Sequence, residues 1–195
     1  MQCIKDTIKN INIVIGCSIG CSYCYARMNN NRFHTIDDFN KPVFFENKLK
    51  MLDNKRHTAY LLTGQSDLSG WNEEWKDKVF SKMKENENTQ YIFLTKRPEN
   101  IKLKETPDNG WFGVTVTSSK EKTRIDYLRN NIKAKHYHIT FEPMFDDVGK
   151  LDLSNISWIV IGTETGNRKG KISSKREWVF NIYNQAKEKN IPVFM

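Results

Sequence analysis

Three cysteines, Cys17, Cys21 and Cys24, stand close together near the start of the chain. The spacing C-x3-C-x2-C lets three thiolates on one loop surround a compact inorganic cluster, because thiolates are the usual protein ligands of iron in such clusters. Gly16 and Gly20 permit the tight turns that this loop would need. Three ligands for a cube of four irons leave one iron without a protein ligand. We therefore expect a 4Fe-4S cluster with one iron open to a cofactor or substrate.

The main alternative for this loop is a structural zinc ion, with Cys3 or a histidine such as His34 as the fourth ligand. Structural zinc sites usually show two separated ligand pairs. The sequence has no second CxxC or HxxxH pair, which makes zinc the less favoured interpretation. Cys3 stands apart from the loop and is interpreted as an ordinary thiol.

Short apolar runs alternate with charged helical stretches, which predicts strands followed by helices. The predicted strands cover residues 11–15, 58–63, 91–95, 111–117, 137–141, 158–161 and the beginning of a seventh at 193–195. Helices are predicted from Tyr25, over 71–85 and over 174–189, with capping-box spacings at Ser118 and Glu121 and at Ser174 and Glu177. The last apparent strand stops at the final residue, a pattern that would fit a chain truncated at its C-terminus.

Strand–helix alternation implies a parallel sheet with right-handed crossovers. The 195 residues are few for a complete eight-stranded barrel and too few for two ordinary domains. We therefore expect an α/β fold, in which residues 1–195 form a single partial (β/α) barrel of about six parallel strands. Such a fold builds its site after the carboxyl ends of the strands. The polar residues and glycines at or after these ends are Gly64, Ser66, Asp67, Lys96, Thr115, Thr117, Glu142, Gly162 and Glu164.

The chain is basic, with 31 Lys and Arg against 23 Asp and Glu and a formal net charge of +8. This balance suits a nucleic acid or another polyanion, but the lysines are interspersed with acids, which favours solvated helix faces. The sequence shows neither an apolar run of membrane-spanning length nor a signal peptide. We therefore expect a cytoplasmic protein without a membrane partner, whose thiols stay reduced.

The cysteine loop, with Tyr23 just before its last cysteine, resembles the signature of the radical S-adenosylmethionine (SAM) superfamily. Short segments across nearly the whole chain resemble the radical SAM mobile pair proteins and the phage Gp37/Gp68-like family. These segments are CYAR at 24–27, LTKRP at 94–98, FGVTV at 112–116, FEPM at 141–144 and WIVIGTETG at 158–166. Two features depart from the pattern. The phage family often has a longer gap between its first two cysteines, and the usual Gly-Gly-Glu-Pro segment reads Gly64-Gln65-Ser66-Asp67 here.

The resemblance implies an enzyme that binds SAM through its amino and carboxylate groups at the open iron. An electron from the reduced cluster would cleave SAM into methionine and a 5′-deoxyadenosyl radical, which abstracts a hydrogen from an unknown substrate. It also implies an electron donor such as flavodoxin or ferredoxin, and a second radical SAM protein as a partner. The alternative is a non-catalytic, basic nucleic-acid-binding module with a structural zinc or iron–sulfur site.

Under this resemblance the strand-end residues and Tyr23 form the cofactor site, and most of them also have an ordinary structural interpretation. Ser66 or Asp67 would accept a hydrogen bond from the SAM ammonium, or form a turn and a helix N-cap. Lys96 would neutralise the SAM carboxylate or a substrate phosphate, or belong to a surface basic pair with Arg97.

The later strands supply the remaining predicted contacts. Thr115 and Thr117 would reach the ribose or methionine part of SAM, or serve as common strand residues. Glu142 would bind a ribose hydroxyl or a substrate amine, or pair with Lys or Arg. Gly162 would let adenine approach the bare backbone, and Glu164 would lie near the adenine or act as a structural ion-pair partner.

Overall fold

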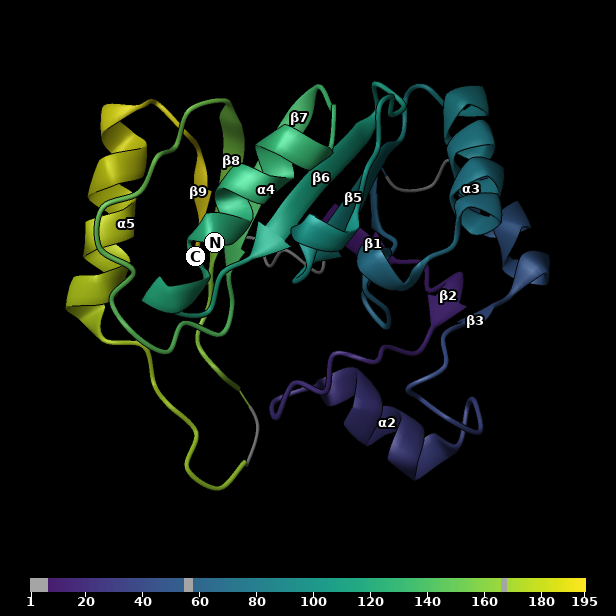
Figure 1. Ribbon diagram of the computed structural model, residues 1–195, viewed down its shortest axis with the longest axis horizontal. Coiled ribbons are helices and arrows are strands. Elements are labelled where there is room, and N and C mark those ends of the chain that lie inside the picture. Colours follow the sequence, from purple (N-terminus) through teal and green to yellow (C-terminus); the bar gives the residue numbers. More distant parts are fainter. Residues whose placement is uncertain (1–6, 55–57, 166–167) are drawn as a thin grey trace.

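A seven-stranded sheet organises the chain in this computed structural model, which describes residues 7–54, 58–165 and 168–195 (Figure 1). The strand order is β1-β4-β5-β6-β7-β8-β9, and every neighbouring pair is parallel. The strands are β1 (Ile8–Asn10), β4 (Ala59–Leu61), β5 (Gln90–Thr95), β6 (Gly110–Thr115), β7 (His136–Phe141), β8 (Ile156–Ile161) and β9 (Val193–Phe194). The sheet curls like half a barrel, so the predicted α/β partial barrel is confirmed at this level, with seven strands where about six were expected.

An α-helix follows β4, β6 and β8, and these three helices cover the convex face of the sheet. The α-helices are α2 (Tyr25–Phe33), α3 (Glu73–Glu85), α4 (Thr123–Asn131) and α5 (Arg176–Glu188). Short 3-10 turns form at η1 (Glu46–Asp53), η2 (Leu68–Gly70), η3 (Pro98–Asn100) and η4 (Ser119–Glu121). In Figure 1, α3, α4 and α5 pack along the sheet, whereas α2 lies apart from them below the carboxyl ends of the strands.

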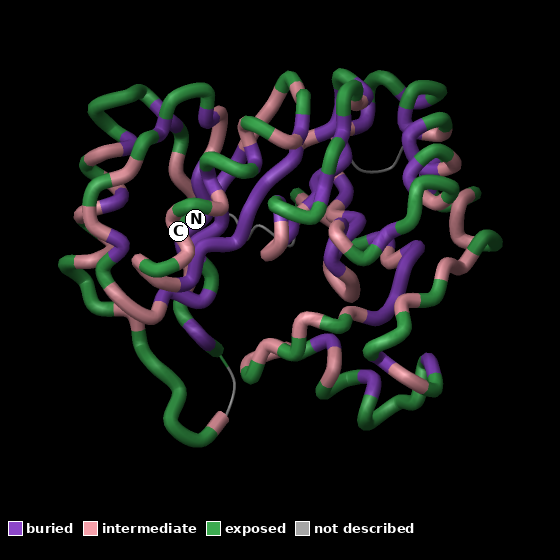
Figure 2. The backbone as a smooth tube through the Cα atoms, viewed as in Figure 1, coloured by how far each residue is buried: buried purple, intermediate pink, exposed green. Residues whose placement is uncertain are grey.

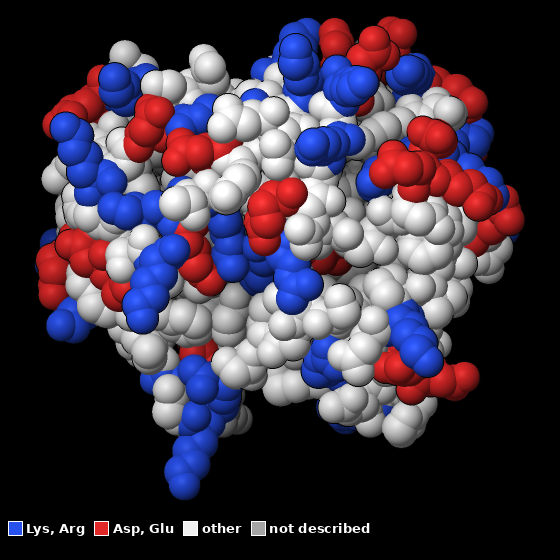
Figure 3. Space-filling view, viewed as in Figure 1, with Lys and Arg blue, Asp and Glu red and all other residues white. Residues whose placement is uncertain are grey.

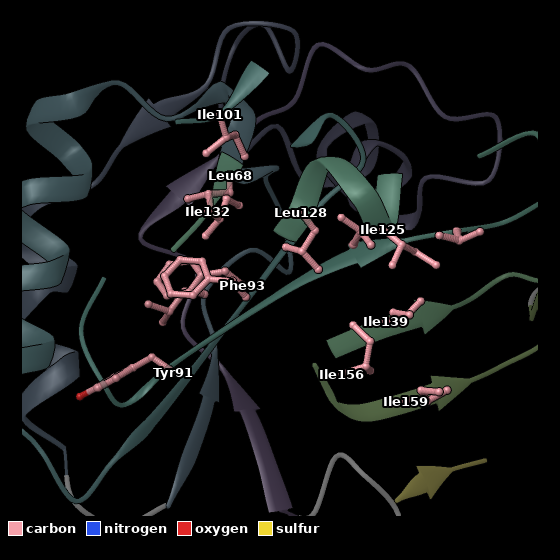
Figure 4. Packing of buried hydrophobic residues seen from close by; sticks show 14 of the residues in the cluster. Leu68, Tyr91, Phe93, Ile101, Ile125, Leu128, Ile132, Ile139, Ile156 and Ile159 are labelled. Atoms are coloured by element: carbon pink, nitrogen blue, oxygen red, sulfur yellow. The ribbon is translucent and has the colours of Figure 1, made fainter. Parts of the chain in front are cut away.

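The main hydrophobic core lies between the convex face and these helices. Alternation along β5 directs Tyr91 and Phe93 toward the helices, where both are fully buried. The Phe93 ring stacks on Phe112 of β6 with centroids 4.9 Å apart. Ile125 and Leu128 of α4 belong to the same cluster (Figure 4), and Figure 2 shows the buried residues following the strands and the helix faces against them.

The concave face carries a different set of side chains. Trp111 stacks on His136 with ring centroids 4.4 Å apart. The His138 ring lies over Gly113, where a Cβ atom would come within 2.3 Å of it, so only glycine fits at that position. Burial lowers the pKa of His138 to about 4, and the imidazole is therefore neutral near pH 7. These rings and the buried His138 line the concave face of the half-barrel.

The N-terminal strand differs from its prediction over residues 11–15. Strand β1 (Ile8–Asn10) pairs with β4, and the chain then leaves the main sheet. Val14–Ile15 forms a separate strand, β2, which pairs antiparallel with β3 (Val43–Phe44). The sequence does not reveal this break, because the residues across it are all apolar. Ile11, Ile13, Val14 and Ile15 are each buried in the structure.

Two predicted capping boxes are wrong in detail. The Ser118 side chain makes no cap hydrogen bond before η4, and Glu121 instead accepts hydrogen bonds from the amide and hydroxyl of Thr117. Helix α5 begins at Arg176 without a side-chain cap, because Ser174 Oγ donates to the Met144 carbonyl.

Within the described ranges, none of the helices combines the length and the apolarity needed to cross a bilayer.

Candidate functional site

The cysteine loop lies over the carboxyl end of β4. The Gly16 amide donates to the Gln65 carbonyl at 2.9 Å, and Gly16 forms a parallel bridge with Ser66. Gly16 has a φ of 114°, and a Cβ atom there would lie 2.9 Å from Pro42 Cα, so a side chain would disrupt the turn. Farther along, the Tyr25 hydroxyl donates to the Gly64 carbonyl at 2.6 Å. These contacts place the loop at the mouth of the half-barrel.

The three thiols of the loop are free and half-buried. Burial raises the pKa of Cys17, and the nearby Asp67, Cys21 and Cys24 raise it further, which indicates that the three cysteines are neighbours. In the described part of the chain, no group of three or more His, Cys, Asp or Glu residues is already arranged to hold a metal ion. Three neighbouring thiols have the donor chemistry of an iron–sulfur cluster site. Because they are not yet arranged around a metal, the loop must bring them closer together to bind a cluster. Cys3 lies outside the described residues.

Tyr23 joins the loop to the ends of other strands. Its ring packs edge-on against Phe145, which follows β7, with centroids 5.3 Å apart. Lys96, just after β5, places Nζ 5.8 Å from the centre of the same ring. Burial raises the pKa of the Tyr23 hydroxyl, and neighbouring Cys21 raises it further. The structure thus brings Tyr23, Lys96 and the cysteine loop together, as the sequence predicted.

Arg27, on the first turn of α2, is a site residue that was not predicted from the sequence. Its Nη2 donates to the Cys17 carbonyl at 2.7 Å, and its guanidinium lies 5.0 Å from the centre of the Phe39 ring. Its Nε is buried and has no hydrogen-bond partner among the described residues. A positive group with a spare donor beside three thiols suits an anionic cluster. The signal that could have found it was its place in the CYAR segment at 24–27, one of the segments that carry the resemblance.

We predict that Arg27→Met weakens cluster retention, because the loop loses a charged hydrogen bond worth about 1.5–3 kcal/mol. Iron should leave reconstituted Arg27→Met several-fold faster than the unaltered protein when a chelator is added. Arg32→Met is the matched control, since Arg32 is exposed at the other end of the same helix. Equal iron loss from both variants would contradict a role for Arg27 in holding the loop.

Asp67 is buried and its carboxylate already has protein partners. Oδ1 accepts hydrogen bonds from the Ser69 amide, the Ser69 hydroxyl and the Thr95 hydroxyl, at 2.7–3.0 Å. Oδ2 accepts one from the Lys96 amide at 2.8 Å. Asp67 is also the N-cap of η2. The geometry therefore favours the structural alternative for Asp67, although the residue does lie at the mouth beside Cys17.

Asn12 has a hydrogen-bond acceptor without a partner in the described part of the chain, close to Gly64. Its Oδ1 is buried and has no hydrogen-bond partner in the described ranges. A Cβ atom on Gly64 would lie 3.0 Å from it, so Gly64 keeps the backbone close to this amide. Ser66 Oγ accepts a hydrogen bond from Trp71 Nε1 at 3.0 Å and is thereby held in place. Nothing in the sequence distinguished Asn12 from the many other asparagines.

The predicted residues on β6, β7 and β8 lie along the same edge of the sheet. Thr115 and Thr117 are both buried, and the Thr117 hydroxyl donates to Glu121. The Glu142 side chain covers Gly162, where a Cβ atom would lie 2.8 Å from it. The bare backbone expected at Gly162 is therefore in contact with a carboxylate from the neighbouring strand.

Glu164 acts as a structural ion-pair partner, one of its two predicted roles. Its buried carboxylate pairs with the Arg168 guanidinium through both oxygens, and it also accepts from the Ile172 amide at 3.4 Å. The hydrogen bond from Arg168 lowers the pKa of Glu164. The carboxylate braces the base of the loop between β8 and α5.

The model of one family matches residues 2–195, and its description is protein of unknown function (DUF5131). A search of curated proteins finds no match. The description assigns no activity, so functional inference depends on the site itself.

Proposed function

The chain belongs to the DUF5131 family, and we propose that it is a radical SAM enzyme whose cluster is held by Cys17, Cys21 and Cys24. The single observation that carries the proposal is the placement of this three-cysteine loop. It lies at the carboxyl edge of a parallel half-barrel, held there by Gly16 and Tyr25. Parallel barrels build their active sites at that edge.

The bound cofactors would supply the reductive cleavage of SAM and the hydrogen abstraction. The chain's own residues would then position them. Arg27 would hold the cysteine loop, and Tyr23 would fix it against Lys96 and Phe145. Lys96 offers a positive charge to the SAM carboxylate, and Asn12 Oδ1 offers the unused acceptor to its ammonium. Glu142 would contact a ribose hydroxyl or a substrate amine.

The proposal includes two kinds of protein partner. An electron donor such as a flavodoxin or ferredoxin would reduce the cluster, and a second radical SAM protein would act alongside this one. Both partners follow from the sequence resemblance. The basic nucleic-acid-binding module with a structural zinc or iron–sulfur site stays as the competing hypothesis. Stoichiometric zinc would favour this module, and formation of 5′-deoxyadenosine from SAM would exclude it.

The test is anaerobic reconstitution followed by reduction with and without SAM. We expect a brown protein with about four irons per chain, as for a three-thiolate cube. SAM should alter the electron paramagnetic resonance spectrum of the reduced protein, and 5′-deoxyadenosine should form. A colourless protein with stoichiometric zinc would reject the proposal in favour of the binding module.

A further inference from the structure

A basic arm projects from the same edge of the sheet as the cysteine loop. We define it as residues 168–176, which lead into the first turn of α5 and contain Arg168, Lys169, Lys171, Lys175 and Arg176 without any acidic residue. In Figure 1 it reaches below the sheet, on the opposite side of the mouth from α2. Figure 3 shows its Lys and Arg side chains standing out from the surface.

The arm is braced at its base rather than attached only through its ends. Glu164 binds Arg168 and the Ile172 amide. The Ser174 amide donates to Thr163 Oγ1 at 3.0 Å, and its hydroxyl donates to the Met144 carbonyl. These contacts neutralise Arg168, whereas Lys169, Lys175 and Arg176 are exposed. Within the described residues, no ion pair forms with Lys169, Lys175 or Arg176.

Aromatic rings accompany these cations on α5. Lys175 Nζ lies 5.3 Å from the centre of the Trp178 ring, and Arg176 Cζ lies 5.1 Å from that of Phe180. Phe180 is 45% exposed, and its ring meets that of Tyr183 edge-on. Arg176, Phe180 and Tyr183 therefore form a stripe on one side of the helix, because residues three and four apart are neighbours.

We propose that this arm and stripe bind single-stranded nucleic acid and guide it to the mouth. Cations on the arm match the phosphate backbone, and the exposed Phe180 ring beside the half-buried Tyr183 provides a platform for a base, which is how sequence-tolerant single-strand sites are built. The inference rests on the proposed function for its chemistry and names nucleic acid as its substrate class. Charge alone would suit other polyanions, and the aromatic stripe is what favours a single strand.

The test measures fluorescence anisotropy of labelled single-stranded RNA and DNA with the full chain, before and after iron reconstitution. An oligomer of roughly 12 nucleotides is long enough for a single-strand site. The variant Lys169→Gln/Lys171→Gln/Lys175→Gln should bind at least about tenfold more weakly near 0.1 M salt. Its salt slope, the change in log affinity with log salt concentration, should be smaller by about 2, because each lost phosphate contact removes about 0.7. Phe180→Ala should lose about fivefold or more in affinity with an unchanged salt slope, because a stacked base is lost and no phosphate contact is.

The matched control is Lys84→Gln/Lys133→Gln/Lys187→Gln, which removes the same charge at exposed positions in or beyond the last turns of α3, α4 and α5. It should bind like the unaltered chain. Equal losses in both triple variants, no binding of either oligomer, or binding only to anionic phosphatidylserine vesicles would each overturn the inference. A protein that takes up iron but does not bind the oligonucleotides would reject this inference and leave the proposed radical SAM chemistry standing. A protein that binds the oligonucleotides but takes up no iron would support the role of the arm and reject that chemistry.

Discussion

Replacing Cys17, Cys21 or Cys24 with alanine, one at a time, should abolish iron binding by the anaerobically reconstituted protein. The physical reason is that a cube with one open iron has no spare protein ligand, so losing one thiolate leaves two irons without protein ligation. Iron and acid-labile sulfide should be measured per chain, together with the visible absorbance. Cys3→Ala serves as the cysteine control and should retain the full iron content.

Cys24 needs a second variant, because its side chain also supports a helix. Cys24 is the N-cap of α2, and its Sγ accepts a hydrogen bond from the Arg27 amide at 3.4 Å. Serine is a strong N-cap residue, so Cys24→Ser should keep α2 and still lose the iron. Circular dichroism would confirm that the helix content is unchanged. A Cys24→Ser protein with full iron, or a Cys3→Ala protein without it, would show that the ligand assignment is wrong.

The strands of the main sheet were the most predictable part of the fold. The segments that became β5, β6, β7 and β8 are short apolar runs, and each was expected within one or two residues of its observed bounds. Burial on both faces makes such strands largely apolar, so the sequence marks them clearly, although β7 also buries His138 and Thr140. Because parallel strands end at one edge, their order along the chain was sufficient to group the predicted mouth residues.

Pairings that depend on distant contacts were not predictable. Strand β3 has only two residues, Val43 and Phe44, and forms solely because β2 lies beside it. Capping residues failed for a similar reason: Ser174 fits a capping box by spacing, but Met144 and Thr163 take its hydrogen bonds. Local propensity is a weak guide where tertiary partners compete for the same group.

The same holds for the site: where its residues lie was predictable from the sequence, whereas their hydrogen-bond partners were not. The sequence placed Tyr23, Lys96 and the cysteines at one mouth, and the structure brings them together. It gave no means of telling that Asp67 and Glu164 are already engaged by protein donors. Orphan groups, such as Arg27 Nε and Asn12 Oδ1, are defined by the absence of partners and become visible only in three dimensions.

Replacing Asp67 should have the largest effect on stability among the predicted mouth residues. Asp67→Ala removes the acceptor of four hydrogen bonds and leaves the Thr95 hydroxyl and the Lys96 amide without their partner. Each buried group left unsatisfied costs about 1–3 kcal/mol, so the free energy of unfolding should fall by roughly 4 kcal/mol. Urea denaturation of the unreconstituted protein measures this loss independently of iron and SAM. Asp38→Ala is the control, because Asp38 accepts hydrogen bonds from Asn40 at an exposed turn, and about 1 kcal/mol or less is expected there.

Asp67→Asn separates the structural role of Asp67 from a role in binding SAM. Asparagine can keep Oδ1 as the acceptor for Ser69 and Thr95, but it places an amide donor against the Lys96 amide in place of Oδ2. We therefore expect an intermediate loss of about 2 kcal/mol in unfolding free energy, with SAM affinity reduced no further than this loosening of the mouth explains. Unchanged stability combined with lost SAM affinity would contradict this assignment. It would return Asp67 to the position of ammonium acceptor, and Asn12 would then have no function in the site.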